Sequence, residues 1–150
     1  VRELIIKTGM TAENLELEIT ETVLMNDKDL AISTLNELSE LGLTLAIDDF
    51  GTGYSSLSYL KQFPLNVLKI DRSFVRDVNI DADDAAIVDA ILAMSRRLNL
   101  NVVAEGVETK EQLAFLQKNG CERVQGYFFS KPLDFDSFST FIEQFNISSY

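Results

Sequence analysis

Side chains with acid–base or ligand chemistry stand where the sequence predicts that buried strands end. Five apolar or alternating segments carry such groups near their carboxyl ends: Glu18; Asp48 with Asp49; Lys69 with Asp71; Glu105; and Gln125. The carboxyl ends of parallel strands meet at one rim of a sheet, so we expect these side chains to lie close together. Several carboxylates at one place repel one another unless cations lie among them. The pattern therefore predicts a cation-dependent site at that rim.

The sequence contains no histidine and a single cysteine, Cys121. These counts exclude Ser-His-Asp and Cys-His nucleophile pairs, and zinc sites built on histidine. Glu18, Asp48 and Asp49 offer hard oxygen ligands instead, which favour Mg²⁺, Mn²⁺ or Ca²⁺. Cys121 follows a helix-stop signal and is expected to be a half-buried structural thiol.

The remaining rim residues suit the hydrolysis of a phosphate ester. Lys69 could orient a metal-bound water or meet a phosphate oxygen. Glu105 could take a proton from the attacking water, and the amide of Gln125 could position that water. Each residue also has a simpler interpretation as a strand-end salt bridge or a helix cap, and Asp48 or Asp49 could cap the helix that follows.

Strand-like and helix-like segments alternate along the whole chain. Strands are predicted at 15–20, 43–49, 67–71, 101–105 and 123–127. Helices are predicted at 1–9, 27–41, 57–63, 85–98, 110–118 and 135–145. This alternation is typical of an α/β domain with a parallel sheet covered by helices, and no linker interrupts it.

Three local patterns sharpen this prediction. Thr109 and Gln112 have the spacing of a capping box at the start of the helix at 110–118. The acidic run at 81–84 lacks the spacing of a calcium-binding EF-hand and is expected to be a solvated loop. Aromatic side chains recur at 135, 138, 141 and 145, and this stripe is expected to pack into the core.

Composition limits the partners that the chain can have. Its 13 basic and 24 acidic residues give a net charge of −11, which argues against binding a nucleic acid polymer. A small anionic ligand stays compatible with this charge if metal cations lie between carboxylates and phosphates. No apolar run approaches the ~18 residues of a membrane span, and a single cysteine fits a reducing compartment, so a cytoplasmic location is expected.

Together, the motifs resemble those of the EAL-type cyclic di-GMP phosphodiesterases of bacterial signalling. They occur in the order of that family and cover essentially the whole chain: Glu18-Ile19-Thr20-Glu21; Asp48-Asp49-Phe50-Gly51-Thr52-Gly53-Tyr54-Ser55-Ser56; Leu68-Lys69-Ile70-Asp71; Ala104-Glu105-Gly106-Val107-Glu108; and Gln125-Gly126-Tyr127 with Phe129-Ser130-Lys131-Pro132. The resemblance implies a TIM-type (β/α)₈ barrel that opens cyclic di-GMP to linear pGpG with two Mg²⁺ or Mn²⁺ ions.

The resemblance also implies roles for the residues at the centre of the site. Glu18, Asp48 and Asp49 correspond to metal ligands, and Asp49 is implied to lie near or to bridge both ions. Lys69 is implied to stabilise the nucleophilic water or the phosphate. Glu105 corresponds to the general base.

Other roles implied by the resemblance concern the surroundings of the site. Gln125 is implied to hold a water or a metal-bound group, and Asp71 to contact a guanine. Glu21 and Glu108 resemble a pair that supports the loop at 50–56 from behind, which includes Phe50, Gly51, Thr52 and Gly53. In the family this loop couples metal binding to dimerisation, so a homodimer is expected through 54–60.

The chain departs from the family pattern at its front. The Glu-Ala-Leu signature and a later Asn ligand are absent, and a full barrel needs about 200–250 residues where this chain has 150. We therefore expect residues 1–150 to be the C-terminal part of one EAL domain, a partial barrel of about five units with about three N-terminal strands missing. On its own, this part is expected to have little or no activity. A sensory or GGDEF domain is expected upstream in the parent protein, and that upstream part could carry a membrane anchor.

Two other interpretations stay open from the sequence alone. The domain could bind cyclic di-GMP as a non-catalytic sensor or effector module, although every catalytic position visible here is intact. The chain could also be a structural fragment that assembles by pairing the open edges of its sheet with another copy.

Overall fold

A computed structural model describes residues 1–52 and 60–145, with the side chains of Met25 and Asn26 excepted. Its elements, in chain order, are α1 (Arg2–Thr8), a 3₁₀ turn (Ala12–Asn14), β1 (Glu16–Thr20), α2 (Glu21–Asn26), α3 (Lys28–Glu40), β2 (Thr44–Phe50), β3 (Val67–Ile70), α5 (Arg72–Arg76), α6 (Ala82–Leu98), β4 (Asn101–Glu105), α7 (Lys110–Lys118), β5 (Arg123–Gln125) and α8 (Phe135–Gln144).

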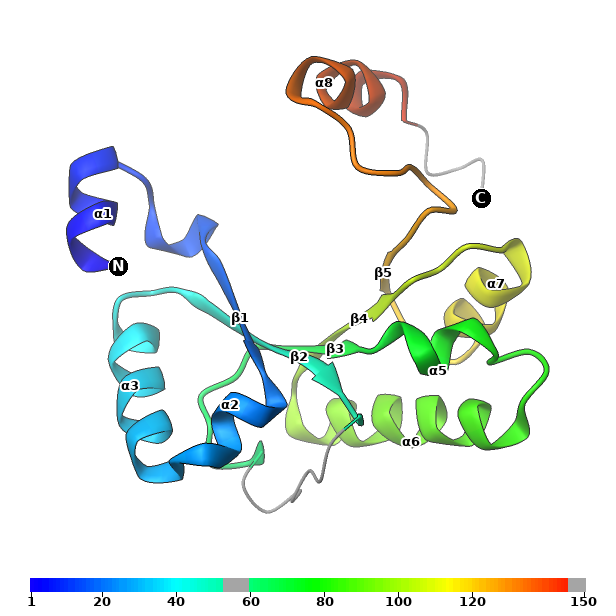
Figure 1. Ribbon diagram of the computed structural model, residues 1–150, viewed down its shortest axis with the longest axis horizontal. Coiled ribbons are helices and arrows are strands. Elements are labelled where there is room, and N and C mark those ends of the chain that lie inside the picture. Colours follow the sequence, from blue (N-terminus) through cyan, green and yellow to red (C-terminus); the bar gives the residue numbers. More distant parts are fainter. Residues whose placement is uncertain (53–59, 146–150) are drawn as a thin grey trace.

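The strands form one parallel sheet in the order β1-β2-β3-β4-β5. Each new strand is added beside the previous one, so the strand order never reverses as it does in a doubly wound nucleotide-binding fold. This one-way winding is that of a TIM-type barrel, and the described strands form part of one. The predicted α/β architecture is confirmed. Figure 1 shows α3 and α6 below the sheet, and α1 and α8 above it.

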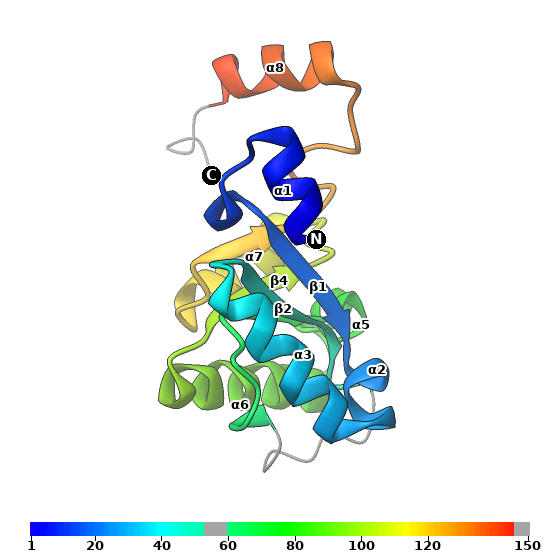
Figure 2. The ribbon, with the colours of Figure 1, turned by 90° about the vertical axis from the view of Figure 1, so that its left-hand side faces the viewer.

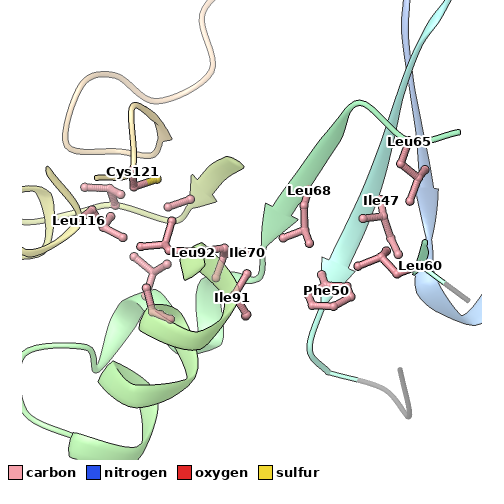
Figure 3. Close-up of a cluster of buried hydrophobic side chains, with 14 of the residues drawn as sticks. Ile47, Phe50, Leu60, Leu65, Leu68, Ile70, Ile91, Leu92, Leu116 and Cys121 are labelled. Atoms are coloured by element: carbon pink, nitrogen blue, oxygen red, sulfur yellow. The ribbon is translucent and has the colours of Figure 1, made fainter. Parts of the chain in front are cut away.

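One face of the sheet, which we call the apolar face, carries the core. Successive residues of a strand point to opposite faces, and the strand register pairs Ile47 with Leu68 and Ile70 with Ala104 on this side. These side chains are at most 1% exposed. Figure 3 shows Ile47, Leu68 and Ile70 in one cluster with Ile91 and Leu92 of α6. The apolar face therefore anchors the strands to their helices.

Caps explain where two of the helices begin. The predicted capping box of α7 is confirmed, since Thr109 accepts from the N–H of Gln112 and the Gln112 side chain accepts from the N–H of Thr109. The predicted loop at 81–84 is wrong, because α6 begins at Ala82. The carboxylate of Asp81 accepts from two free N–H groups of its first turn, so the acidic run starts a helix instead.

Two short helices were not predicted from the sequence. α2 follows β1 directly, and α5 follows β3 after one residue, Asp71. They span six and five residues, too short to show a helical repeat of apolar positions. The helix predicted at 57–63 lies outside the described residues up to 59. Among the described helices, none has the length and apolarity that crossing a membrane requires.

The aromatic stripe of α8 is not part of the core, contrary to the sequence prediction. Phe135 is 82% and Phe138 is 49% exposed, and no residue of α8 is buried. The loop between β5 and α8 leads the chain away from α6 and α7, so that α8 stands above the sheet (Figure 2). The helix itself forms as predicted, but its aromatic stripe stays largely exposed, and Phe145 at its end contacts Phe129, with 6.1 Å between the ring centroids.

Candidate active site

The ammonium group of Lys69 occupies the centre of the other face of the sheet, which we call the polar face. Lys69 lies in β3, the middle strand, and is 5% exposed. Its Nζ lies 2.7 Å from Glu18 Oε1 and 2.8 Å from Glu105 Oε1. The distance from Nζ to Asp48 Oδ1 is 3.2 Å. One cation from the middle strand thus links carboxylates from β1, β2 and β4.

These contacts decide the charge of the lysine. Burial lowers the pKa of Lys69, because it disfavours the charged form. The contacts with Glu105, Glu18 and Asp48 outweigh burial, so the pKa of Lys69 lies above its usual value. The side chain is therefore an ammonium ion throughout the physiological range of pH.

Strand register explains why these side chains meet. Thr20 pairs with Asp48, and Lys69 pairs with Val103, two residues before Glu105. Residues two apart point to the same side of a strand, so Glu18, Asp48, Lys69, Glu105 and Gln125 all share the polar face. From the sequence, these five side chains were predicted to lie at one rim of the sheet. The structure sets Glu18 and Lys69 inside their strands, so the cluster lies within the sheet face and not only along its edge.

A β-bulge separates the two adjacent aspartates. Ile47 pairs with Leu68 and Phe50 pairs with Ile70. Between these two pairs β2 therefore advances by three residues while β3 advances by two. The extra residue is accommodated at Asp49, whose φ of 53° is in the left-handed region. The bulge returns Phe50 to the apolar face, where it is 4% exposed, and leaves both carboxylates at the strand end. A left-handed non-glycine residue beside a charged cluster is typical of functional sites.

Asp49 and Asp71 have opposite electrostatic environments. Burial, followed by the charges of Asp48 and Asp71, raises the pKa of Asp49 above its usual value. Burial also raises the pKa of Asp71, but hydrogen bonds from the hydroxyl and the N–H of Ser73 outweigh it and lower the pKa overall. Asp71 therefore caps α5 in this structure, and its predicted guanine contact stays a prediction.

The loop after the aspartates is held from behind by Glu21. This carboxylate is 3% exposed, and its Oε2 accepts from the N–H of Gly51 at 3.4 Å. Thr52 closes the turn by donating from its hydroxyl to the backbone oxygen of Asp49. Glu108, the predicted companion of Glu21, is exposed, and its side chain forms no hydrogen bond or ion pair with the described part of the loop, residues 50–52. Gly53 and the predicted dimer segment up to 59 lie outside these residues.

A cavity of about 770 Å³ opens beside Glu105. Its walls come from the ends of β4 and β5, the start of α5, the loop after β5 and the inner side of α8, and they include Arg72, Glu105, Glu108, Gln125, Lys131 and Phe138. Its size is in the range of small-molecule sites. Arg72 was not among the predicted site residues, although it directly follows the candidate Asp71, and Lys131 was predicted as part of a motif without a role of its own. Because Phe138 and Phe141 line this cavity, α8 forms one of its walls.

The donor set suits hard divalent cations. Its ligand atoms are carboxylate oxygens, and Asp48 Oδ1 is buried and accepts no hydrogen bond, although it lies within ion-pair distance of Lys69. Such an oxygen has spare capacity for a cation. Within the described ranges, no three acidic or cysteine side chains are already arranged around a metal position. The Lys69 ammonium offsets only part of the negative charge of the three carboxylates around it.

Comparison with known proteins gives a consistent picture. A family model described as "EAL domain" matches residues 1–132. The cyclic di-GMP phosphodiesterase NbdA of Pseudomonas aeruginosa is 50% identical over 149 residues, which are 99% of this chain and 19% of NbdA. The bifunctional diguanylate cyclase/cyclic di-GMP phosphodiesterase MucR of the same organism is 48% identical over 133 residues, 89% of this chain and 19% of MucR. The chain thus spans about a fifth of the length of these relatives.

Solved structures agree with the described fold. A c-di-GMP complex of the PaMucR phosphodiesterase matches with a TM-score of 0.89 and 46% identity, over 92% of this chain and 56% of that one. A manganese/cy-diGMP complex of Klebsiella pneumoniae BlrP1 matches with a TM-score of 0.81 and 38% identity, over 87% of this chain and 33% of that one. The same protein is also solved as a calcium/cy-diGMP complex.

Proposed function

The chain belongs to the EAL-domain family, and on this premise we propose that it is the C-terminal part of a metal-dependent phosphodiesterase domain. The complete domain hydrolyses cyclic di-GMP to linear pGpG in bacterial second-messenger signalling. The relatives named as cyclic di-GMP phosphodiesterases support the substrate and the reaction class. The observation that carries the proposal is the buried Lys69 ammonium held by carboxylates from three strands.

Glu18, Asp48 and Asp49 are the residues of this chain that hold the metal ions. Their oxygen-only donor set fits Mg²⁺ or Mn²⁺, and the manganese and calcium complexes of BlrP1 support a divalent cation. When bound, such ions lower the pKa of a water and offset the negative charge of the phosphate. The metal-ligating residues that this chain lacks belong to the remainder of the domain, which includes about three further strands.

Glu105 acts as the general base in this proposal. Its Oε1 lies 2.8 Å from Lys69 Nζ and its side chain lines the cavity, so its carboxylate is positioned to accept a proton from a water bound there. Lys69 also presents positive charge to the phosphate oxygens as negative charge develops there. Gln125 pairs in register with Glu105 and lines the same cavity, so its amide orients the attacking water.

Product formation by matched variants tests this function. In the full-length protein with Mn²⁺, we expect Glu105→Gln to reduce the release of linear dinucleotide by at least about 10³-fold and to retain binding, because only the proton acceptor is lost. Glu111→Gln, the same change at an exposed position of α7, serves as the control. Turnover retained by Glu105→Gln would remove Glu105 as the base.

The same assay distinguishes the enzyme from a binding module. Cyclic di-GMP that binds in the presence of Ca²⁺ but is not cleaved with Mg²⁺ or Mn²⁺ would identify a sensor. Purified residues 1–150 are expected to release little or no linear product, because part of the metal ligand set lies in the remainder of the domain. Efficient cleavage by this chain alone would overturn that expectation.

The loop after Asp49 is proposed to couple the metal site to a homodimer interface. Glu21 supports this proposal, because its buried carboxylate ties the loop to the start of α2. Light scattering of the full-length protein at several concentrations tests the dimer, and a monomer throughout would refute it. A GGDEF or sensory domain is proposed upstream, in line with the bifunctional name of MucR.

A further inference from the structure

The buried amide of Gln112 joins two segments that border the proposed active site. Gln112 lies in the first turn of α7 and is 6% exposed. Its Oε1 accepts from the N–H of Glu108 at 2.7 Å and from the N–H of Thr109 at 3.0 Å. Its Nε2 donates to the backbone oxygen of Arg76, in the last turn of α5, at 2.9 Å. A helix leaves its last carbonyl groups without partners of its own, so this bond ties the end of α5 to the start of α7.

The three partners of this amide require a glutamine. Two N–H groups face its oxygen and one carbonyl group faces its nitrogen, so only one orientation of the amide satisfies all of them. A glutamate could accept from the same two N–H groups, as it does in many capping boxes, but it has no donor for the oxygen of Arg76. The capping of α7 therefore does not account for the bond to α5.

The segment that Gln112 holds begins at the proposed general base. Glu105 ends β4 and Glu108 follows three residues later, and both line the cavity. Between them, the N–H of Val107 donates to the backbone oxygen of Gln125 at 3.1 Å. Backbone pairing with the end of β5 thus holds the middle of this segment, and Gln112 holds its far end.

Helix α5 packs against the loops that follow β2 and β4. A Cβ atom on Gly106 would lie 2.5 Å from Arg72 Cβ, and one on Gly51 would lie 2.9 Å from Phe74 Cε2. The helix also follows β3, the strand of Lys69, after a single residue. A displacement of α5 would therefore disturb the loop after the aspartates, the segment after the base and one wall of the cavity together.

Building on the proposed function, we propose that Gln112 is a positioning residue for the hydrolysis. It keeps Glu105 within reach of the attacking water by holding the segment after β4 against α5. Strand pairing fixes the backbone only up to the end of β4, and beyond that point the segment depends on contacts such as this one. A displacement of a general base by about 1 Å removes a large part of its effect, so a buried bond behind the site can influence the rate.

Two variants of the full-length protein separate this role from helix capping. Gln112→Glu keeps the acceptor of the capping box and loses the donor to Arg76, so with Mn²⁺ we expect kcat to fall about ten- to hundredfold and KM to stay nearly unchanged. Thr109→Ala removes the other half of the capping box and keeps the bond to Arg76. We expect it to lower the unfolding temperature of the domain by about 2–4 °C and to leave kcat within about twofold. Gln117→Glu adds the same charge at an exposed position of α7 and is the control for charge.

Binding shows whether Gln112→Glu has kept its fold. In calorimetry with Ca²⁺, we expect its affinity for cyclic di-GMP to stay within about threefold of the unsubstituted protein. An unchanged kcat in Gln112→Glu, an equal loss of kcat in Thr109→Ala, or a loss of binding as large as the loss of turnover would refute the positioning role alone. If the unsubstituted protein does not cleave cyclic di-GMP, the proposed function fails and this inference fails with it.

Discussion

The two faces of the sheet are built from alternate residues of the same strands, yet they are stabilised in opposite ways. On the apolar face, Leu68 packs in a cluster of many buried apolar side chains that share the burial energy. On the polar face, three carboxylates depend on the one ammonium of Lys69. Burial on the apolar face therefore stabilises a sheet whose polar face carries an excess of negative charge. That excess is suited to binding cations.

Adjacent residues of β3 give the sharpest test of this difference. Lys69→Met is expected to cost about 3 kcal/mol, because it leaves partly buried carboxylates facing one another. Leu68→Ala is expected to cost about the same through a cavity on the apolar face. Urea unfolding measures both losses. Added Mg²⁺ or Mn²⁺ should stabilise Lys69→Met more than Leu68→Ala, because only Lys69→Met lacks the ammonium that offsets the carboxylate charge. Equal stabilisation of both variants would break the comparison.

The raised pKa of Lys69 predicts how this stabilisation depends on pH. A folded-state pKa above the unfolded value gives a contribution that is complete below the unfolded pKa, about 10.4, and is lost as the pH rises through the folded pKa. The stability difference between the unsubstituted protein and Lys69→Met should stay constant from pH 7 to 9. It should shrink by about 1.4 kcal/mol near pH 11.4.

Urea unfolding across this pH range measures the effect, with Lys118→Met as the control. Lys118 is exposed in the last turn of α7, so its variant should keep a small and constant difference from the unsubstituted protein. A stability difference for Lys69→Met that shrinks already between pH 7 and 9 would contradict the ionic role of Lys69.

Two substitutions at Asp49 separate the effect of its charge from the effect of its left-handed backbone at the bulge. Asparagine tolerates the left-handed conformation and removes the carboxylate charge, whose burial and repulsion from Asp48 and Asp71 raise the pKa of Asp49. Asp49→Asn should therefore stabilise the fold by about 0.5 kcal/mol after solvent screening. Alanine tolerates this conformation poorly, and Asp49→Ala should destabilise the fold by about 1 kcal/mol. Both variants should lose metal-dependent turnover. Equal unfolding midpoints for the two variants would show that the backbone strain is negligible.

The sequence predicts the apolar face better than the polar face. Apolar runs and their spacing locate all the described strands within one or two residues, because burial imposes a pattern on each segment separately. The bulge at Asp49 depends on how β2 and β3 align, with Ile47 opposite Leu68 and Phe50 opposite Ile70. No pattern within β2 alone contains that information.

The positions of the candidate side chains also depend partly on patterns within one segment and partly on contacts between segments. Strand ends predict that Lys69 and Glu105 meet, since parallel strands bring their carboxyl ends to one rim. They do not predict that Lys69 is buried at the centre, which requires the alternation of faces across four strands. Arg72 was missed as a residue of the cavity wall, because its position depends on the close passage of Gly106, a contact between distant segments.

The smallest effect is expected at α8, where the sequence pattern was correct about the helix and wrong about its burial. Phe135 is 82% exposed, so Phe135→Ser should change the free energy of unfolding by less than about 0.5 kcal/mol. Phe63 is 6% exposed, and Phe63→Ala should cost about 3–4 kcal/mol. Urea unfolding of residues 1–150 compares the two variants. A loss above about 1 kcal/mol for Phe135→Ser would mean that the aromatic stripe is covered in solution, and a midpoint that rises with protein concentration would identify the cover as a second copy of the chain.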